Sequence, residues 1–284
     1  SKDSRTHLFT KTFVDLEFDS FLRSDLEIQY QRVSNDMYLK LFDLESPLLK
    51  TDISSLESYI KLDIEKENTN FTSSFQIFES LSGTHSDRYQ YVFPTYSYSR
   101  LFYPEKLDGS FTFSSGGSNE LANTNILSTD ISNDLIYNSY DSFLDNGIKH
   151  NYKIFLKNLN SIGKRHAVYK NSPQSEGMTG YMFNMSLPLI KKNSTITNLL
   201  EPKLSLQFSP HEMKDISNTN NRINASNAYS FNRLGSGSTF EEGASLTVGF
   251  DFIKQKEVEK FDSQGNLQSL EIEDFFEMKL ATVL

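Results

Sequence analysis

The chain has 284 residues, of which 37% are hydrophobic, and it carries a formal net charge of -9. This acidic balance, with no basic stripe to offset it, argues against nucleic acid as a partner. Because no apolar run approaches the roughly 18 residues of a membrane helix, any membrane-spanning part has to consist of strands. Cysteine is absent, so the sequence contains neither a disulfide framework nor a thiolate site.

Segments in which apolar and polar residues alternate follow one another along the chain, and none has helical periodicity. The clearest is 58–65, where three aliphatic residues alternate with one lysine and two acidic residues. Successive side chains of a strand point to opposite faces, so this segment has one apolar and one charged face. The expected strands are 14–18, 26–30, 58–65, 71–77, 94–100, 107–113, 127–137, 150–156, 181–187, 200–208, 244–253 and 270–280.

The connections between these segments differ in length. Residues 18–23 and 65–70 predict tight turns, whereas 211–228 predicts a long loop rich in Asn and Ser, and another long loop is expected around Gly116 and Gly117. Strands of about ten residues between short turns and long loops are typical of a transmembrane β-barrel. No linker or shift in composition divides the chain, so residues 1–284 are expected to belong to one domain.

No group of residues predicts catalysis or a fixed metal. His211 and Glu212 resemble the opening of a zinc-protease motif, but Asp215 stands where the second histidine is required. The segment 235–238 lacks the Lys-Ser/Thr partner of a phosphate loop and is interpreted as a flexible loop. We therefore expect no catalytic residue, no metal and no cofactor, and a protein that is not an enzyme.

Five short segments occur in an order that matches one known family. Val33–Leu39 is similar to its "vSDxxYL" segment, Tyr91–Pro94 to the start of a tyrosine-bearing strand, and Leu199–Leu204 to its "LEPrl" strand start. Phe231–Leu234 and Glu242–Gly249 are similar to its "NRfsG.dRvegGtrltyGl" block. By these segments the chain resembles the LptD (OstA) family of outer-membrane lipopolysaccharide-assembly proteins. The landmark residues are Asp36, Tyr38, Pro94, Glu201, Pro202, Asn232, Arg233, Gly243 and Gly249.

The resemblance implies an incomplete piece of an antiparallel transmembrane β-barrel in the bacterial outer membrane. An N-terminal periplasmic domain and the first and last barrel strands would lie outside it. The family passes the glycan of lipopolysaccharide through a hydrophilic lumen while the lipid leaves sideways. Lipopolysaccharide, an LptE-type lipoprotein plug and an LptA-type periplasmic bridge are the implied partners.

Strand alternation assigns candidate residues to the two environments of such a barrel. The residues expected to line the lumen are Lys61, Asp63, Glu65, Lys153, Lys203 and Gln207. The residues expected to face lipid are Ile60, Leu62, Ile64, Leu204, Leu206 and Phe208.

Two other functions remain open from the sequence. Another large outer-membrane barrel, such as a porin or receptor, explains the strands but not the order of the landmark segments. A soluble all-β binding module predicts instead that the apolar faces pack on each other.

The net negative charge raises a question for the lipopolysaccharide-assembly interpretation, because an acidic lumen should repel the phosphates of lipopolysaccharide. Either the phosphates travel with the lipid outside the lumen, or divalent ions bridge them to carboxylates.

Overall fold

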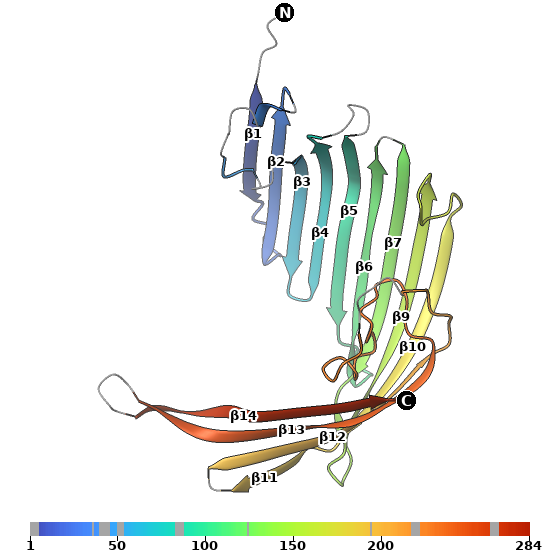
Figure 1. The fold of residues 1–284 in the computed structure, drawn as a ribbon. Coiled ribbons are helices and arrows are strands. Elements are labelled where there is room, and N and C mark those ends of the chain that lie inside the picture. The colour runs from blue at the N-terminus through green and yellow to red at the C-terminus, as the bar shows by residue number, and fades with distance from the viewer. Residues whose placement is uncertain are drawn as a thin grey trace, which may run out of the picture. The chain divides into compact units, whose positions relative to one another are not determined.

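The computed structural model describes residues 6–35, 37–39, 46–49, 54–82, 88–123, 125–193, 195–216, 222–261 and 267–284. Within these ranges almost all regular structure is β-strand (Figure 1), and only residues 38–39 are helical. They are β1 (His7–Asp15), β2 (Arg23–Val33), β3 (Ser55–Lys66), β4 (Thr69–Ser80), β5 (Tyr89–Phe102), β6 (Gly109–Ala122), β7 (Ile126–Ser139), β8 (Ser142–Phe143), β9 (Lys149–Lys164), β10 (Gln174–Ser186), β11 (Leu189–Asn193), β12 (Ile196–Ser209), β13 (Gly243–Phe261) and β14 (Leu267–Val283).

The strands form one antiparallel sheet, in which almost every strand pairs with its neighbour in the sequence. The fourteen-stranded sheet runs in chain order from β1 to β14, with the short strands β8 and β11 attached to β9 and β12. Because β1 and β14 are its two edges, the sheet is open within the described residues. The all-β antiparallel prediction is confirmed at this level.

The chain divides into two compact units. Unit 1 comprises Ser1–Phe102, Thr112–Leu135 and Lys157–Gly177, and unit 2 comprises Tyr103–Phe111, Ile136–Leu156 and Met178–Leu284. The strands β1 to β5 therefore belong to unit 1 and β11 to β14 to unit 2, while β6, β7, β9 and β10 contribute residues to both.

Most strands are longer than predicted, as in β9, β10 and β13, and three differences concern more than length. The long loop expected around Gly116 and Gly117 is wrong, because both glycines lie inside β6. A Cβ atom on Gly117 would lie 2.5 Å from the carbonyl oxygen of Asp130, so glycine allows a close backbone approach here. The first strand ends at Asp15 and begins earlier than expected, since it pairs with β2 from His7 onward. The short strands β8 and β11 were not predicted.

In unit 1 the pairing register gathers apolar residues of neighbouring strands on one face. Leu26 pairs with Leu62, and Ile28 pairs with Ile60, which pairs in turn with Phe75. The side chains of Ile60 and Phe75 are each 50% exposed, although they are large and apolar. We call this the apolar face of unit 1. The opposite, polar face carries Lys11, Glu27, Tyr59, Lys61, Asp63 and Ser74.

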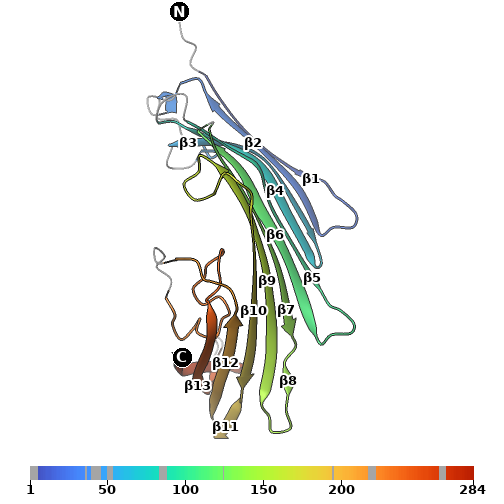
Figure 2. The ribbon, with the colours of Figure 1, turned by 90° about the vertical axis from the view of Figure 1, so that its right-hand side faces the viewer.

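Unit 2 has the same division into faces, on strands that Figure 2 shows side by side. Leu206 pairs with Phe183 on β10 and with Leu246 on β13, and it is 49% exposed. Its neighbours along β12 alternate sharply, because Ser205 is 3% and Gln207 is 7% exposed. The apolar face of unit 2 carries Tyr181, Phe183, Leu204, Leu206, Phe208 and Leu246. Its polar face carries Asn151, Asn184, Glu201, Lys203, Gln207, Thr247 and Asp251.

One small hydrophobic cluster is buried among the described residues of unit 1. Val33, Leu39, Leu56 and Leu81 are buried together, with Phe9 and other side chains packed against them. The long apolar rows on the strands do not take part in this cluster. No helix among the described residues is long and apolar enough to cross a membrane.

Candidate functional site on the polar faces

The charged residues of the polar face in unit 1 form ion pairs on and between strands. Lys11 Nζ on β1 lies 2.6 Å from Glu27 Oε1 on β2. On β3, Lys61 Nζ lies 2.8 Å from Asp63 Oδ2, and Asp63 also accepts a 2.8 Å hydrogen bond from the Thr72 hydroxyl. Two predicted lumen residues, Lys61 and Asp63, therefore lie on this face and are bonded to each other.

A polar hollow of about 420 Å³ lies on this face of unit 1. Gln31 organises its edge, since its side-chain amide donates to the Leu48 carbonyl (2.6 Å) and accepts from the Glu57 backbone N–H (3.0 Å). The Gln29 amide donates to the Glu57 carbonyl (3.0 Å). Side-chain amides thus replace backbone pairing where the ladder between β2 and β3 ends.

The polar face of unit 2 carries a denser network of charges. Lys203 Nζ lies 2.6 Å from Asp251 Oδ2 and 3.4 Å from Glu201 Oε2. Lys149 Nζ lies 3.8 Å from Glu201 and 3.7 Å from Asp141. Both lysines are therefore shared between two carboxylates.

Two asparagines extend this network across β9 and β10. The Asn184 side-chain amide donates to Asn151 Oδ1 (2.9 Å), and the Asn151 amide donates in turn to Asp141 (2.6 Å). A pocket of about 240 Å³ opens over these groups. It is lined by Lys149, Asn151, Asn184, Met185, Ser186, Glu201, Lys203, Leu204 and Tyr229.

The described part of the connection between β12 and β13 (orange in Figures 1 and 2) packs onto the polar face of unit 2, where it contacts Gln207 and Thr247. Arg233 anchors it, and its side chain is only 2% exposed. The guanidinium donates to Glu241 (2.6 Å) within the connection, and to Ser245 (2.9 Å) and Thr247 (3.2 Å) on β13. Every nitrogen of the buried cation thus has a partner, which is the condition for burying a guanidinium at an acceptable cost.

Aromatic packing holds the same connection against β9 and β10. The Phe231 ring stacks on Phe155 with centroids 3.8 Å apart and planes 10° apart. Gly180 lies directly under Phe231, and a Cβ atom there would overlap the ring. The Gln207 amide donates to the Phe231 carbonyl (3.0 Å), so this predicted lumen residue lies beneath the connection.

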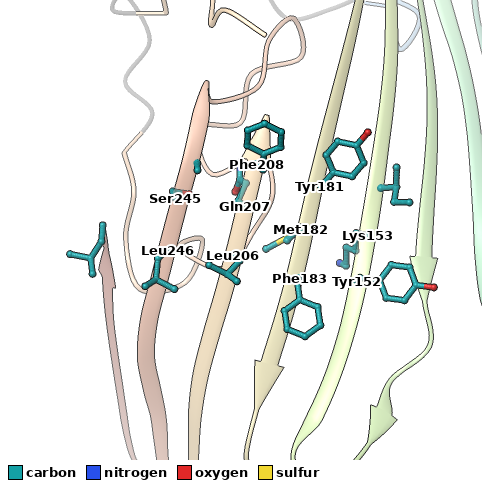
Figure 3. A pocket seen from close by; sticks show the side chains of 13 residues that line it. Tyr152, Lys153, Tyr181, Met182, Phe183, Leu206, Gln207, Phe208, Ser245 and Leu246 are labelled. Carbon is teal, nitrogen blue, oxygen red and sulfur yellow. The ribbon is translucent and has the colours of Figure 1, made fainter. Parts of the chain in front are cut away.

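The apolar face of unit 2 contains an open groove of about 590 Å³ (Figure 3). Leu206 and Phe208, both predicted to face lipid, lie in it with Tyr152, Tyr181 and Phe183 from the neighbouring strands. Ile60, Leu62 and Ile64 lie on the corresponding face of unit 1. The assignment of these residues to lipid stays a prediction.

The remaining predicted lumen residues differ in their surroundings. Lys203 is the centre of the network described above, and Glu65 lies exposed near the end of β3, opposite Arg23. Lys153 lies on β9, two positions from Asn151, and makes no ion pair with any described residue. The structure therefore brings Lys203 and Gln207 together with the β12–β13 connection within unit 2.

Several landmark residues also have identifiable structural roles. Asn232 donates to the Ser236 carbonyl (2.6 Å) in the turn after Arg233. Gly243 begins β13 with a positive φ of 83°, and Gly249 lies against the Leu280 backbone. The remaining landmarks are placed as follows: Tyr38 beside His7, Pro94 in β5, Glu201 and Pro202 in β12, and Asp36 outside the described residues.

Sequence reasoning missed the anchoring role of Arg233, which entered only as a landmark. It also missed Tyr229, and it named Phe231 only as the start of a landmark segment, without its packing on Phe155. The signal present was a set of aromatic residues and an arginine inside a connection otherwise rich in Asn, Ser and Gly. A solvated loop has no need of such residues, whereas a connection that packs on the sheet does.

The geometry defines a class of protein, an antiparallel β-sheet protein that exposes large apolar side chains on one face and, in unit 2, covers its polar face with the β12–β13 connection. No protein-family model matches the chain, and no characterised protein is significantly similar to it. Among the described residues, no three His, Cys, Asp or Glu side chains are grouped so that they could hold a metal ion.

Proposed function

We propose that this chain forms part of the wall of an outer-membrane β-barrel. The observation that supports this most strongly is the inversion of the two faces on β12, where Leu206 and Phe208 are about half exposed while Ser205 and Gln207 are buried. A sheet in water buries its apolar face and exposes its polar face. A barrel in lipid does the opposite, because its outer face contacts acyl chains and its inner face contacts water or polar groups.

Within this class, the protein we propose is an LptD-like component of the lipopolysaccharide translocon. Support comes from the sequence landmarks, because Glu201, Pro202, Arg233 and Gly249 lie on β12, on β13 or in the connection between them. The polar faces would carry the hydrophilic glycan, and the apolar faces would contact the bilayer. Transport work would come from an energy source elsewhere, with an LptE-type plug and an LptA-type bridge as partners.

Site-specific photo-crosslinking in living cells tests the proposal. A photoreactive amino acid is placed at Lys61, Asp63 or Lys153 on the polar side, with Leu62 and Leu206 as controls on the apolar side. Lipopolysaccharide adducts are expected at the polar positions, and they should vanish when ATP supply is blocked. The apolar controls should instead form adducts with membrane lipids.

Other outcomes separate the alternative functions. Lipid adducts at Leu62 and Leu206 without lipopolysaccharide at the polar positions would contradict the translocon and leave a porin or receptor barrel. Adducts at the polar positions that persist without ATP would also contradict transport. A chain that stays soluble without detergent, with no lipid adducts, would overturn the barrel itself.

A further inference from the structure

We infer that the 240 Å³ pocket beside Tyr229 in unit 2 binds one uncharged, hydroxyl-rich sugar ring and rejects phosphate. The inference rests on the proposed function and specifies which part of a glycan this face holds. It follows from three features of the pocket: its charge balance, its hydrogen-bonding groups and its aromatic wall.

The charge balance opposes an anionic ligand. The two lysines, Lys149 and Lys203, lie within 4.0 Å of three carboxylates, those of Asp141, Glu201 and Asp251. The cluster therefore carries a formal charge of -1, and neither lysine is left without a counter-charge. A phosphate entering here would meet carboxylates at short range, where repulsion between like charges is strongest.

The hydrogen-bonding groups suit hydroxyls, which both donate and accept. Asn184 donates to Asn151, but its Oδ1 accepts no hydrogen bond from a described residue. An amide carbonyl offers two lone pairs, and the carboxylates of Glu201 and Asp251 have further acceptor capacity. Ligand hydroxyl groups can donate to these oxygens without disrupting the ion pairs.

The size and walls of the pocket fit a single ring. Its volume lies below the roughly 300–1,000 Å³ of pockets that enclose drug-sized ligands. Tyr229 forms an aromatic wall, with the Lys203 Nζ atom 5.9 Å from its ring centroid. The Tyr229 hydroxyl is buried without a hydrogen-bond partner, and burial raises its pKa. The hydroxyl is therefore turned away from solvent. The aromatic ring is the part of Tyr229 that can pack against the C–H face of a sugar.

A lysine without an ion pair to any described residue lies outside this pocket and lines the 590 Å³ groove instead. Lys153 makes no ion pair with a described residue and does not line the pocket. Sugar binding and phosphate binding would therefore depend on different residues. This separation also accounts for how an acidic chain could hold part of an anionic lipopolysaccharide.

Saturation-transfer NMR with the full chain tests the inference, in a detergent whose head group is not a sugar. The probes are methyl α-D-glucopyranoside and inorganic phosphate. We expect transfer to the glucoside with a Kd on the order of 1 mM, about -4 kcal/mol. Phosphate should not displace it. Asn184→Leu should weaken binding at least about fivefold, whereas the matched control Asn198→Leu, outside the pocket, should leave it unchanged.

A second variant, Tyr229→Leu, approaches the same pocket from the connection rather than from the sheet. If circular dichroism shows that Asn184→Leu does not fold, the Tyr229→Leu variant tests the pocket in its place. Displacement of the glucoside by phosphate would overturn the inference. So would glucoside binding that survives both variants, or the absence of binding to the unaltered chain. None of these results would affect the crosslinking experiment. The barrel proposal is therefore tested independently of the sugar pocket.

Discussion

The polar face of unit 1 over β1 to β4 and the polar face of unit 2 differ in how their charges are satisfied. In unit 1 the pairs join side chains of the sheet itself, and Lys61 remains 39% exposed beside Asp63. In unit 2 the chain folds its own β12–β13 connection onto the face and buries Arg233 almost completely.

This difference implies different contributions to stability. A partly exposed ion pair is hydrated and screened by salt, so it contributes little to the free energy of folding. A buried cation costs several kcal/mol to desolvate and is tolerated only while all its partners stay in place. The connection over unit 2 is therefore expected to be a fixed part of the fold, whereas the polar face of unit 1 over β1 to β4 stays hydrated and adaptable.

The largest effect is expected from Arg233→Met, which removes the buried guanidinium and leaves Glu241 without its partner. Losing one member of a buried pair costs about 3–5 kcal/mol. We expect a loss of about 3 kcal/mol in the free energy of unfolding, measured by denaturant titration, and new proteolytic cleavage within 222–242. Arg222→Met, at an exposed arginine of the same connection, is the control. Equal behaviour of the two variants would show that Arg233 does not hold the connection.

A somewhat smaller effect is expected when the apolar face receives a charge. Leu206→Arg should destabilise the protein in lipid vesicles by about 2–4 kcal/mol if the residue lies near the bilayer midplane. The conservative variant Leu206→Met should cost less than about 1.5 kcal/mol. If the arginine variant refolds into vesicles as readily as the methionine variant, the apolar face of unit 2 does not contact lipid.

The smallest effect is expected in unit 1. Lys61→Met breaks the pair with Asp63, which keeps the Thr72 hydroxyl as a donor. For an exposed pair the loss should be about 0–1 kcal/mol, and added salt should reduce it further. Unfolding titrations at low and high salt measure both quantities. A salt-independent loss as large as that for Arg233→Met would mean that this face is also dry, and the contrast between the units would disappear.

Sequence alone was sufficient to separate the faces of single strands. Ile60 and Leu62 lie opposite Lys61 and Asp63 because adjacent side chains in a strand point in opposite directions, whatever the strand pairs with. The same local rule assigned Leu206 and Gln207 to opposite faces of the sheet. The two-residue turn at Glu67 and Asn68 was also predictable, because it lies between two strongly alternating segments.

What depends on distant parts of the chain came only from the tertiary structure. Gly117 could be recognised as a strand residue only once Asp130 had come within contact distance. The folding of the β12–β13 connection onto the sheet depends on Arg233 meeting Thr247 and on Phe231 meeting Phe155 and Gly180. Alternation thus determined which residues share a face, because it is a property of neighbouring residues. Only the fold decided what covers that face, because the covering groups lie up to 76 positions apart, from Phe155 to Phe231.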